Sequence, residues 1–75
     1  MKNRVIFTRH ALEKLRERHI PKTLVLQTIN DCEKMVYEHG YYYAFHKWKR
    51  RYLKVVFKRE GERIVVITQY FIDHL

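Results

Sequence analysis

Four side chains in the second half of the sequence could together cleave RNA without a metal ion: His46, Arg51, Lys54 and Tyr70. In such a reaction a base takes the proton of the ribose 2′-hydroxyl, cations stabilise the charge on the phosphorane, and an acid protonates the leaving oxygen. Histidine, lysine, arginine and tyrosine can fill these roles. All four residues are expected in or beside a β-sheet. The competing interpretation is that they are ordinary surface side chains, because such residues are abundant in this chain.

A basic, aromatic-rich segment surrounds these residues. From position 39 to position 59 the chain contains no Asp or Glu, whereas basic residues and rings are frequent. Further candidates for binding RNA or a partner protein are Lys47, Lys49, Arg50, Tyr52 and Lys58. Cations neutralise phosphates and flat rings stack on exposed bases, so the segment favours a platform for single-stranded RNA. The alternative is a solvated basic strand face, since about half of the rings must face the core of a two-layer fold.

The charge of the whole chain indicates the same kind of partner. Sixteen Lys and Arg against eight Asp and Glu give a formal net charge of +8 over 75 residues. Such a field attracts nucleic acid, anionic lipid or an acidic protein. Residues 1–7 contain only a short apolar run, and no apolar stretch approaches the roughly 18 residues that a membrane span needs. With Cys32 as the one cysteine, no internal disulfide can form, so we expect a cytoplasmic protein that does not enter a membrane.

Signals for other chemistries are missing from the sequence. It contains no P-loop, no Gly-rich nucleotide fingerprint and no metalloprotease helix motif. The five histidines show no metal-ligand pairing. Cys32 is expected to be a small buried helix residue rather than a zinc ligand or a nucleophile. We therefore expect neither a bound metal nor a cofactor.

Two residues of the first predicted helix are separate binding candidates. His10 lies away from the apolar stripe that contains Leu12 and Leu15, so it is expected on the surface in the first turn. Arg18 flanks this stripe and is expected against the sheet edge or paired with an acid. A catalytic or binding role is left open for both.

The first part of the chain predicts a strand and two helices. Residues 5–7 read as a short strand, and Thr8 is a candidate helix N-cap. The first helix should stop near residues 19–20, because Pro21 disfavours helical geometry in the residue before it. Pro21 is suited to the first position of a second helix. The buried stripe of that helix is expected to consist of Val25, Thr28, Ile29 and Cys32.

The second part predicts a meander of four strands. They are expected at residues 35–38, 41–48, 52–58 and 64–68, with turns at residues 39–40, 49–50 and 60–61. In the third of these strands, one face should carry Leu53, Val55 and Phe57, and the other Tyr52, Lys54 and Lys58. The last strand is apolar on both faces, which is typical of a central strand. The expected fold is one α+β domain, residues 1–75, with a two-helix hairpin packed on one face of a small, largely antiparallel sheet.

Several short segments resemble the RelE/ParE toxin superfamily, and in particular a short branch of RelE-like domains. They are Phe7-Thr8-Arg9-His10-Ala11, Leu15, Glu17-Arg18-His19-Ile20 and Ile64-Val65-Val66-Ile67-Thr68-Gln69-Tyr70. The resemblance implies the same two-helix and sheet fold and an antitoxin protein as partner. In members that cleave mRNA on the ribosome, it implies basic sheet residues and a tyrosine or histidine near the C-terminus. Arg51 and Lys54 match the sheet cations, and Tyr70 and His74 fall in the C-terminal region. Other members poison gyrase and need no nuclease centre.

Three functions remain open at this point. The leading one is a toxin-like RNA-binding protein of a toxin–antitoxin system, acting as a metal-independent, ribosome-dependent mRNA endoribonuclease. The second is a non-catalytic RelE/ParE-like module that engages a protein partner or nucleic acid. The third is a nucleic-acid-binding accessory protein, whose binding should depend steeply on salt. The sequence does not determine the oligomeric state.

Overall fold

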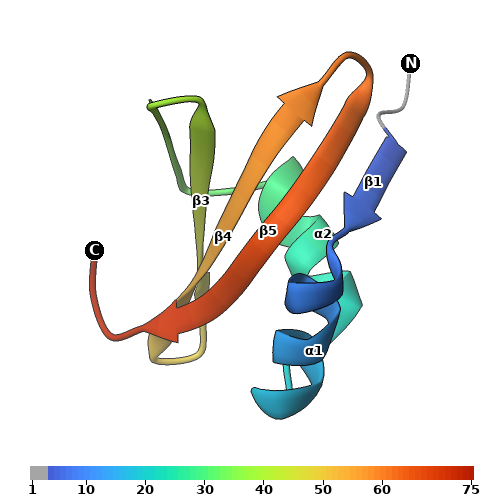
Figure 1. Cartoon of the computed structure of the whole chain (residues 1–75). Helices are drawn as coiled ribbons and strands as arrows, with labels where there is room; N and C mark the ends of the chain where they lie inside the picture. Colours follow the sequence, from blue (N-terminus) through green and yellow to red (C-terminus); the bar gives the residue numbers. More distant parts are fainter. Residues whose placement is uncertain (1–3) are drawn as a thin grey trace.

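Two α-helices and a five-stranded, mostly antiparallel sheet form the protein in a computed structural model that describes residues 4–75 (Figure 1). In chain order the elements are β1 (Arg4–Phe7), α1 (Arg9–Glu17), α2 (Lys22–Asn30), β2 (Lys34–Glu38), β3 (Tyr41–Trp48), β4 (Arg51–Glu60) and β5 (Arg63–Ile72). The predicted α+β class, with two helices before a strand meander, is confirmed. Residues 1–3, part of the stretch 1–7 with its short apolar run, lie outside the described residues. Neither helix within residues 4–75 has the length and apolar character to cross a membrane.

The strands lie in the order β1-β5-β4-β3-β2. β1 pairs with β5 in parallel, and the other neighbouring pairs are antiparallel. β5 therefore lies inside the sheet between β1 and β4, as its apolar character on both faces predicts. The two helices connect β1, at one edge, to β2 at the other.

Helix α1 begins with the predicted cap. The Thr8 hydroxyl accepts a hydrogen bond from the Ala11 amide at 3.0 Å, which satisfies a backbone donor that has no partner within the helix. The same hydroxyl donates to the Ile67 carbonyl at 3.3 Å. The N-terminus of α1 is thereby attached to strand β5.

Helix α1 ends earlier than the predicted boundary at residues 19–20. Its last residue is Glu17, and His19 takes the left-handed conformation at φ 55°. The Ile20 amide donates to the Leu15 carbonyl at 2.9 Å, and both side chains belong to the buried core. This is the Schellman arrangement, in which a left-handed residue closes the last turn and an apolar contact seals it. The helix is therefore stopped by its own C-terminal cap and not by Pro21.

Helix α2 follows after a short connection. Pro21, predicted as the first helical residue, is instead the N-cap residue, so the helix starts one residue later, at Lys22. The fully or nearly fully buried side chains of α2 are Leu24, Val25 and Thr28. The Thr28 hydroxyl donates to the Leu24 carbonyl at 2.8 Å, so its burial leaves this donor satisfied. Ile29, predicted as buried, is only partly buried against the core. Cys32, predicted as a buried helix residue, follows the C-cap residue Asp31 and is also only partly buried, so it lies outside the helix.

Two tight turns set the register of β2, β3 and β4. His39 and Gly40 have φ values of 54° and 85°, and left-handed geometry at both positions matches the twist of the flanking strands. At the next turn, Trp48 pairs with Arg51 directly across residues 49–50. Both turns lie at their predicted positions.

The last hairpin turn lies one residue later than predicted. Glu60 pairs with Arg63, so the turn is formed by Gly61 and Glu62 instead of residues 60–61. Gly61 has a φ of 62°, a conformation that glycine adopts without steric cost. Glu60 consequently belongs to strand β4.

A β-bulge interrupts the pairing of β4 with β5. Val56 pairs with Thr68, whereas Phe57 pairs with Val66, so Ile67 is an extra residue on β5. A bulge of this kind shifts the alternation of side chains by one position. Each side chain of β5 after Ile67 therefore lies on the opposite face of the sheet from the one it would occupy in a regular strand.

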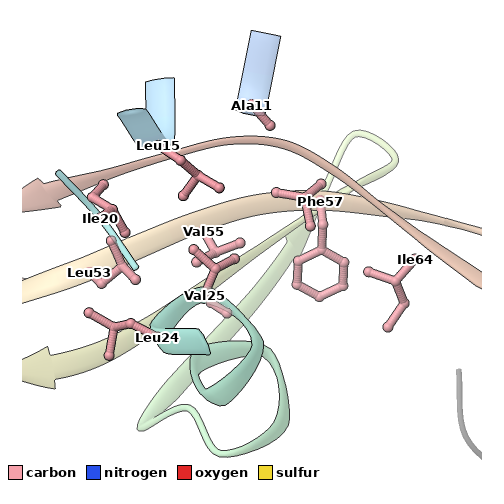
Figure 2. Packing of buried hydrophobic residues seen from close by; sticks show 11 residues of the cluster. Ala11, Leu15, Ile20, Leu24, Val25, Leu53, Val55, Phe57 and Ile64 are labelled. Carbon is pink, nitrogen blue, oxygen red and sulfur yellow. The ribbon is translucent and has the colours of Figure 1, made fainter. Parts of the chain in front are cut away.

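One cluster of buried apolar side chains joins the helices to the sheet (Figure 2). The strands contribute Ala44, Leu53, Val55, Phe57, Ile64 and Val66, and the helical part contributes Ala11, Leu15, Ile20, Leu24 and Val25. The predicted inward-facing set of β4 is confirmed. Both helices therefore pack on the same face of the sheet. We call this face the helix side and the opposite one the outer face, which no helix of residues 4–75 covers.

Candidate nucleic-acid interface

A row of alternating cations and rings crosses the outer face. From β2 to β5 the row consists of Lys34, Phe45, Lys54 and Tyr70, each paired with the next by the strand register. Directly paired residues of neighbouring strands project from the same face. In β4, Lys54 alternates with the buried Leu53 and Val55, so the row lies on the outer face. We call these four residues, with Tyr43 and Arg18 that contact them, the outer strip.

Lys54 occupies the centre of the outer strip. Its Nζ atom lies 5.1 Å from the ring centre of Tyr43, 5.8 Å from that of Phe45 and 5.5 Å from that of Tyr70. The attraction of a cation to one such ring is worth roughly 0.5–1 kcal/mol at an exposed site. Three rings together therefore hold the lysine over the middle strands of the sheet.

Arg18 reaches the outer strip around the edge of β5. β1 pairs with β5 only as far as Val66, which leaves an open edge on the rest of β5. There the Arg18 guanidinium donates a hydrogen bond to the Gln69 carbonyl at 2.8 Å, and its central carbon lies 5.7 Å from the Tyr70 ring centre. The prediction that Arg18 lies against the sheet edge is confirmed. Tyr70 is consequently contacted by Arg18 from the edge and by Lys54 from β4.

A buried hydrogen bond holds α1, and with it Arg18, in place against β5. Gln69 is fully buried, and its side-chain amide donates to the Ala11 carbonyl at 2.9 Å. The bulge at Ile67 is what directs Gln69 to the helix side and its neighbour Tyr70 to the outer face. The same local irregularity therefore positions the helix and one ring of the outer strip.

The cations of the outer strip keep their charge uncompensated. Among the ion pairs formed by residues 4–75, none includes Arg18, Lys34 or Lys54. Lys58, further along the same face of β4, instead lies 3.0 Å from Glu60. Their hydrogen bond raises the pKa of Lys58 and lowers the pKa of Glu60. A polyanion would thus meet free positive charge at the strip and a neutralised pair at Lys58.

Other predicted binding residues lie next to the outer strip. Lys47 and Tyr52 pair with each other and form the neighbouring row toward the β3–β4 turn. Lys49 and Arg50 are exposed in that turn, and the Lys49 Nζ atom lies 5.6 Å from the Trp48 ring centre. The basic surface therefore continues from the strip to this end of the sheet.

Arg51, predicted to act together with Lys54, lies on the opposite face of the sheet. Its Nε atom lies 3.5 Å from the Asp73 carboxylate, and its guanidinium carbon lies 5.1 Å from the Phe71 ring centre. Because Phe71 packs against the core, this group lies on the helix side at the end of the sheet. Arg51 is therefore separated from Lys54 by the sheet itself.

His46 also belongs to the helix side. It pairs with the buried Leu53, and its Nδ1 atom is buried. The four candidate catalytic residues are consequently not brought into one site. Lys54 and Tyr70 are neighbours on the outer face, whereas His46 and Arg51 face the other way.

The two candidates on α1 have separate positions. His10 is exposed in the first turn, as predicted, and the first turn lies on the helix side. Arg18 caps the other end of the helix and is the residue that contacts the outer strip.

Three members of the outer strip are absent from the predicted site: Lys34, Tyr43 and Phe45. A signal for them exists in the sequence. The two-residue turn predicted at 49–50 requires Phe45 to pair with Lys54, and the turn at 39–40 requires Lys34 to pair with Phe45. The register that a tight turn imposes would therefore have identified most of the row.

The arrangement offers three kinds of chemistry. Cations neutralise phosphates, rings stack on bases, and a phenol can donate or accept a proton. No group of three or more His, Cys, Asp or Glu within residues 4–75 is arranged to hold a metal ion. The chemical groups of the strip are thus its ammonium and guanidinium cations, its rings and the hydroxyls of Tyr43 and Tyr70.

Comparison with known proteins identifies a family but no relative of known activity. A family model described as "Domain of unknown function (DUF4258)" matches residues 7–71. No curated protein and no solved structure matches the chain. The matched residues include α1, α2, every member of the outer strip and all of the strand meander except its last residue, Ile72.

Proposed function

The chain belongs to the family described as Domain of unknown function (DUF4258), and we propose that its outer face binds single-stranded RNA. The observation that carries this proposal is the setting of Lys54, which is held among three rings and has no carboxylate partner among residues 4–75. Bases stack on exposed rings at roughly 1–3 kcal/mol each, while the cations between the rings neutralise the phosphates that connect the bases. Neighbouring strands are about 4.8 Å apart, so the rings on β3, Tyr43 and Phe45, and the ring of Tyr70 on β5 lie about two strand spacings apart, on either side of Lys54.

We further propose that the protein is a toxin-like, metal-independent mRNA endoribonuclease that acts on the ribosome. Tyr70 supports this because it combines an ionisable hydroxyl with two contacting cations, Arg18 and Lys54. In the proposed reaction the ribose 2′-oxygen attacks phosphorus and loses its proton to a base. The phosphorus–5′-oxygen bond breaks, and the 5′-oxygen leaves with a proton from an acid. Tyr70 is the acid that protonates the leaving 5′-oxygen, a water molecule takes the 2′-hydroxyl proton and returns a proton to the Tyr70 phenolate, and Arg18 and Lys54 stabilise the charge of the phosphorane.

The proposed biological setting is a toxin–antitoxin system. The resemblance to the RelE/ParE superfamily supports it, together with the α+β arrangement of a helix pair on a mostly antiparallel sheet. An antitoxin protein and the ribosome are the proposed partners, in the cytoplasm. An acidic antitoxin segment would complement the formal charge of +8.

Inducible expression in a bacterial host tests the enzymatic proposal. Growth and new mRNA 5′ ends are followed for the wild type and for Tyr70→Phe, Lys54→Met and Arg18→Met. We expect growth arrest with discrete new ends inside translated codons for the wild type, and loss of both in Tyr70→Phe. Arg51→Ala serves as the control, because this residue lies on the helix side. Equal loss of cleavage in Arg51→Ala and Tyr70→Phe would contradict the proposed site.

A non-catalytic binding module is the second candidate function. The position of His46 favours it, because this histidine lies on the helix side and leaves the strip without an imidazole for proton transfer. In this case the RNA pool stays intact on expression, while single-stranded RNA still binds in vitro with a steep salt dependence. Binding that barely changes between low and high salt would exclude an electrostatic interface of either kind.

A further inference from the structure

Strand β2 forms an open edge of the sheet. It pairs with β3 on one side only, and α2 packs mainly on β4 and β3. An edge strand presents N–H and C=O groups that can pair with another chain, and proteins usually block such edges with proline, a bulge or a covering element. β2, Lys34–Glu38, contains no proline, and its pairing with β3 has no register shift. Nothing in residues 4–75 covers its free side.

The helix side of this edge carries exposed apolar side chains. Met35 is 43% exposed and Tyr37 is 62% exposed. Tyr37 lies 4.6 Å from Tyr42, and Tyr42 stacks 5.2 Å from Phe57, measured between ring centres. A ladder of rings thus leads from the core to the edge and ends at a ring that is mostly in water. Exposed rings of this kind are typical of contact surfaces.

We propose that β2 pairs antiparallel with β2 of a second copy of this chain, with Val36 at the centre of the two-fold symmetry. In this register Lys34 faces Glu38 of the second copy, and Met35 faces Tyr37 of the second copy. Each pair occurs twice, because a two-fold contact uses the same patch on both chains. Directly opposed charges of opposite sign and opposed apolar side chains both stabilise antiparallel pairing. Neither Lys34 nor Glu38 has an ion-pair partner among residues 4–75.

The charge distribution allows two basic chains to meet at this edge. In residues 31–38 the acids Asp31, Glu33 and Glu38 outnumber the one cation, Lys34. Lys54 lies two strands away, at about 10 Å from the edge, which is near the Debye length at physiological ionic strength. The second copy therefore meets a segment in which acids outnumber cations. In the dimer the two sheets become one, and both outer faces lie on the same side.

Self-association measured by analytical ultracentrifugation tests the proposal. We expect a reversible dimer of about twice the 9.4 kDa of one chain, formed as the concentration rises toward roughly 1 mM, since one strand pair is a small interface. Glu38→Lys or Lys34→Glu turns both opposed pairs into like charges and should weaken association about tenfold. Glu62→Lys has the same charge change in the exposed β4–β5 turn and is expected to leave association unchanged.

Charge exchange distinguishes this register from any other. The double variant Lys34→Glu/Glu38→Lys restores opposite charges and should dimerise like the wild type. Mixing the two single variants should produce a mixed dimer, because each supplies the charge that the other needs. A misfolded variant could not give this result, and circular dichroism and the melting temperature check folding independently.

Three outcomes would overturn the proposal. They are a wild type that stays monomeric up to roughly 1 mM, a dimer that neither single variant weakens, and a double variant that remains as weak as the single ones. Binding of oligouridine by the same samples is measured separately. Failure of RNA binding would leave the dimer intact, and a monomeric wild type that binds RNA would reject only the dimer.

Discussion

Two cations of strand β4 have opposite surroundings. Lys54, on the outer face, lies among three rings and has no carboxylate partner within residues 4–75. Arg51, on the helix side, contacts one ring and lies 3.5 Å from the Asp73 carboxylate. Similar residue types thus give free positive charge on one face and compensated charge on the other. The number of cations in a segment therefore does not locate a polyanion site, whereas the strand face and the neighbouring acids do.

Reversing the charge of Lys54 is expected to have the largest effect on RNA binding by the outer face. Lys54→Glu removes the cation from its rings and places a carboxylate against RNA phosphates. We expect a loss of roughly 2–3 kcal/mol in binding free energy, about 30- to 150-fold in affinity. Fluorescence anisotropy with oligouridine at constant ionic strength measures it. Lys22→Glu is the matched control on α2, and an equal loss there would mean that total charge, rather than the outer strip, governs binding.

Removing the ring of Tyr70 should have the next largest effect. Tyr70→Leu loses a stacking surface, which corresponds to roughly 1–2 kcal/mol of binding free energy. Tyr70→Phe keeps the ring and should bind RNA within about twofold of the wild type. The slope of affinity against salt should be unchanged in both variants, because neither alters a charge. A similar loss in both variants would assign the effect to the hydroxyl instead of the ring.

Truncating Arg51 should have only a small effect on RNA binding. Its side chain faces the helix side and is already paired with Asp73. Arg51→Ala is therefore expected to cost less than about 0.5 kcal/mol of binding free energy, the range of an exposed ion pair. The same anisotropy titration measures it. A loss as large as that of Lys54→Glu would show that RNA contacts both faces and would remove the contrast between them.

The smallest expected effect concerns the Lys58–Glu60 pair at the far end of β4. The hydrogen bond with Lys58 lowers the pKa of Glu60 in the folded protein. The pair therefore stabilises the fold at pH values above the pKa that Glu60 has in the unfolded chain. This contribution is lost as the pH falls through the lower, folded-state pKa. Lys58→Met should raise the pKa of Glu60 toward its ordinary value, as measured by NMR titration of the side-chain carboxyl. An unchanged titration midpoint would contradict the pairing.

Local signals in the sequence were sufficient for much of the fold. Thr8 caps α1 because a hydroxyl at that position satisfies a backbone donor nearby in the chain. The turn at His39 and Gly40 needs only its own backbone geometry. The end of α1 was harder to predict, because His19 takes the left-handed conformation, which at helix ends is usually adopted by glycine. The contact of Ile20 with the core, which is not a local signal, stabilises this helix end.

The sequence by itself determined the row from Lys34 through Phe45 to Lys54. Two-residue turns allow one register, and strand alternation then assigns each side chain to a face. Only the tertiary structure decided that Tyr70 completes this row and that Arg18 reaches it. Without the bulge at Ile67, the register of the β4–β5 turn would pair Lys54 with Gln69 instead of Tyr70. The bulge is compatible with the packing because Gln69 then bonds to the backbone of α1, a contact between positions far apart in the chain that no local pattern encodes.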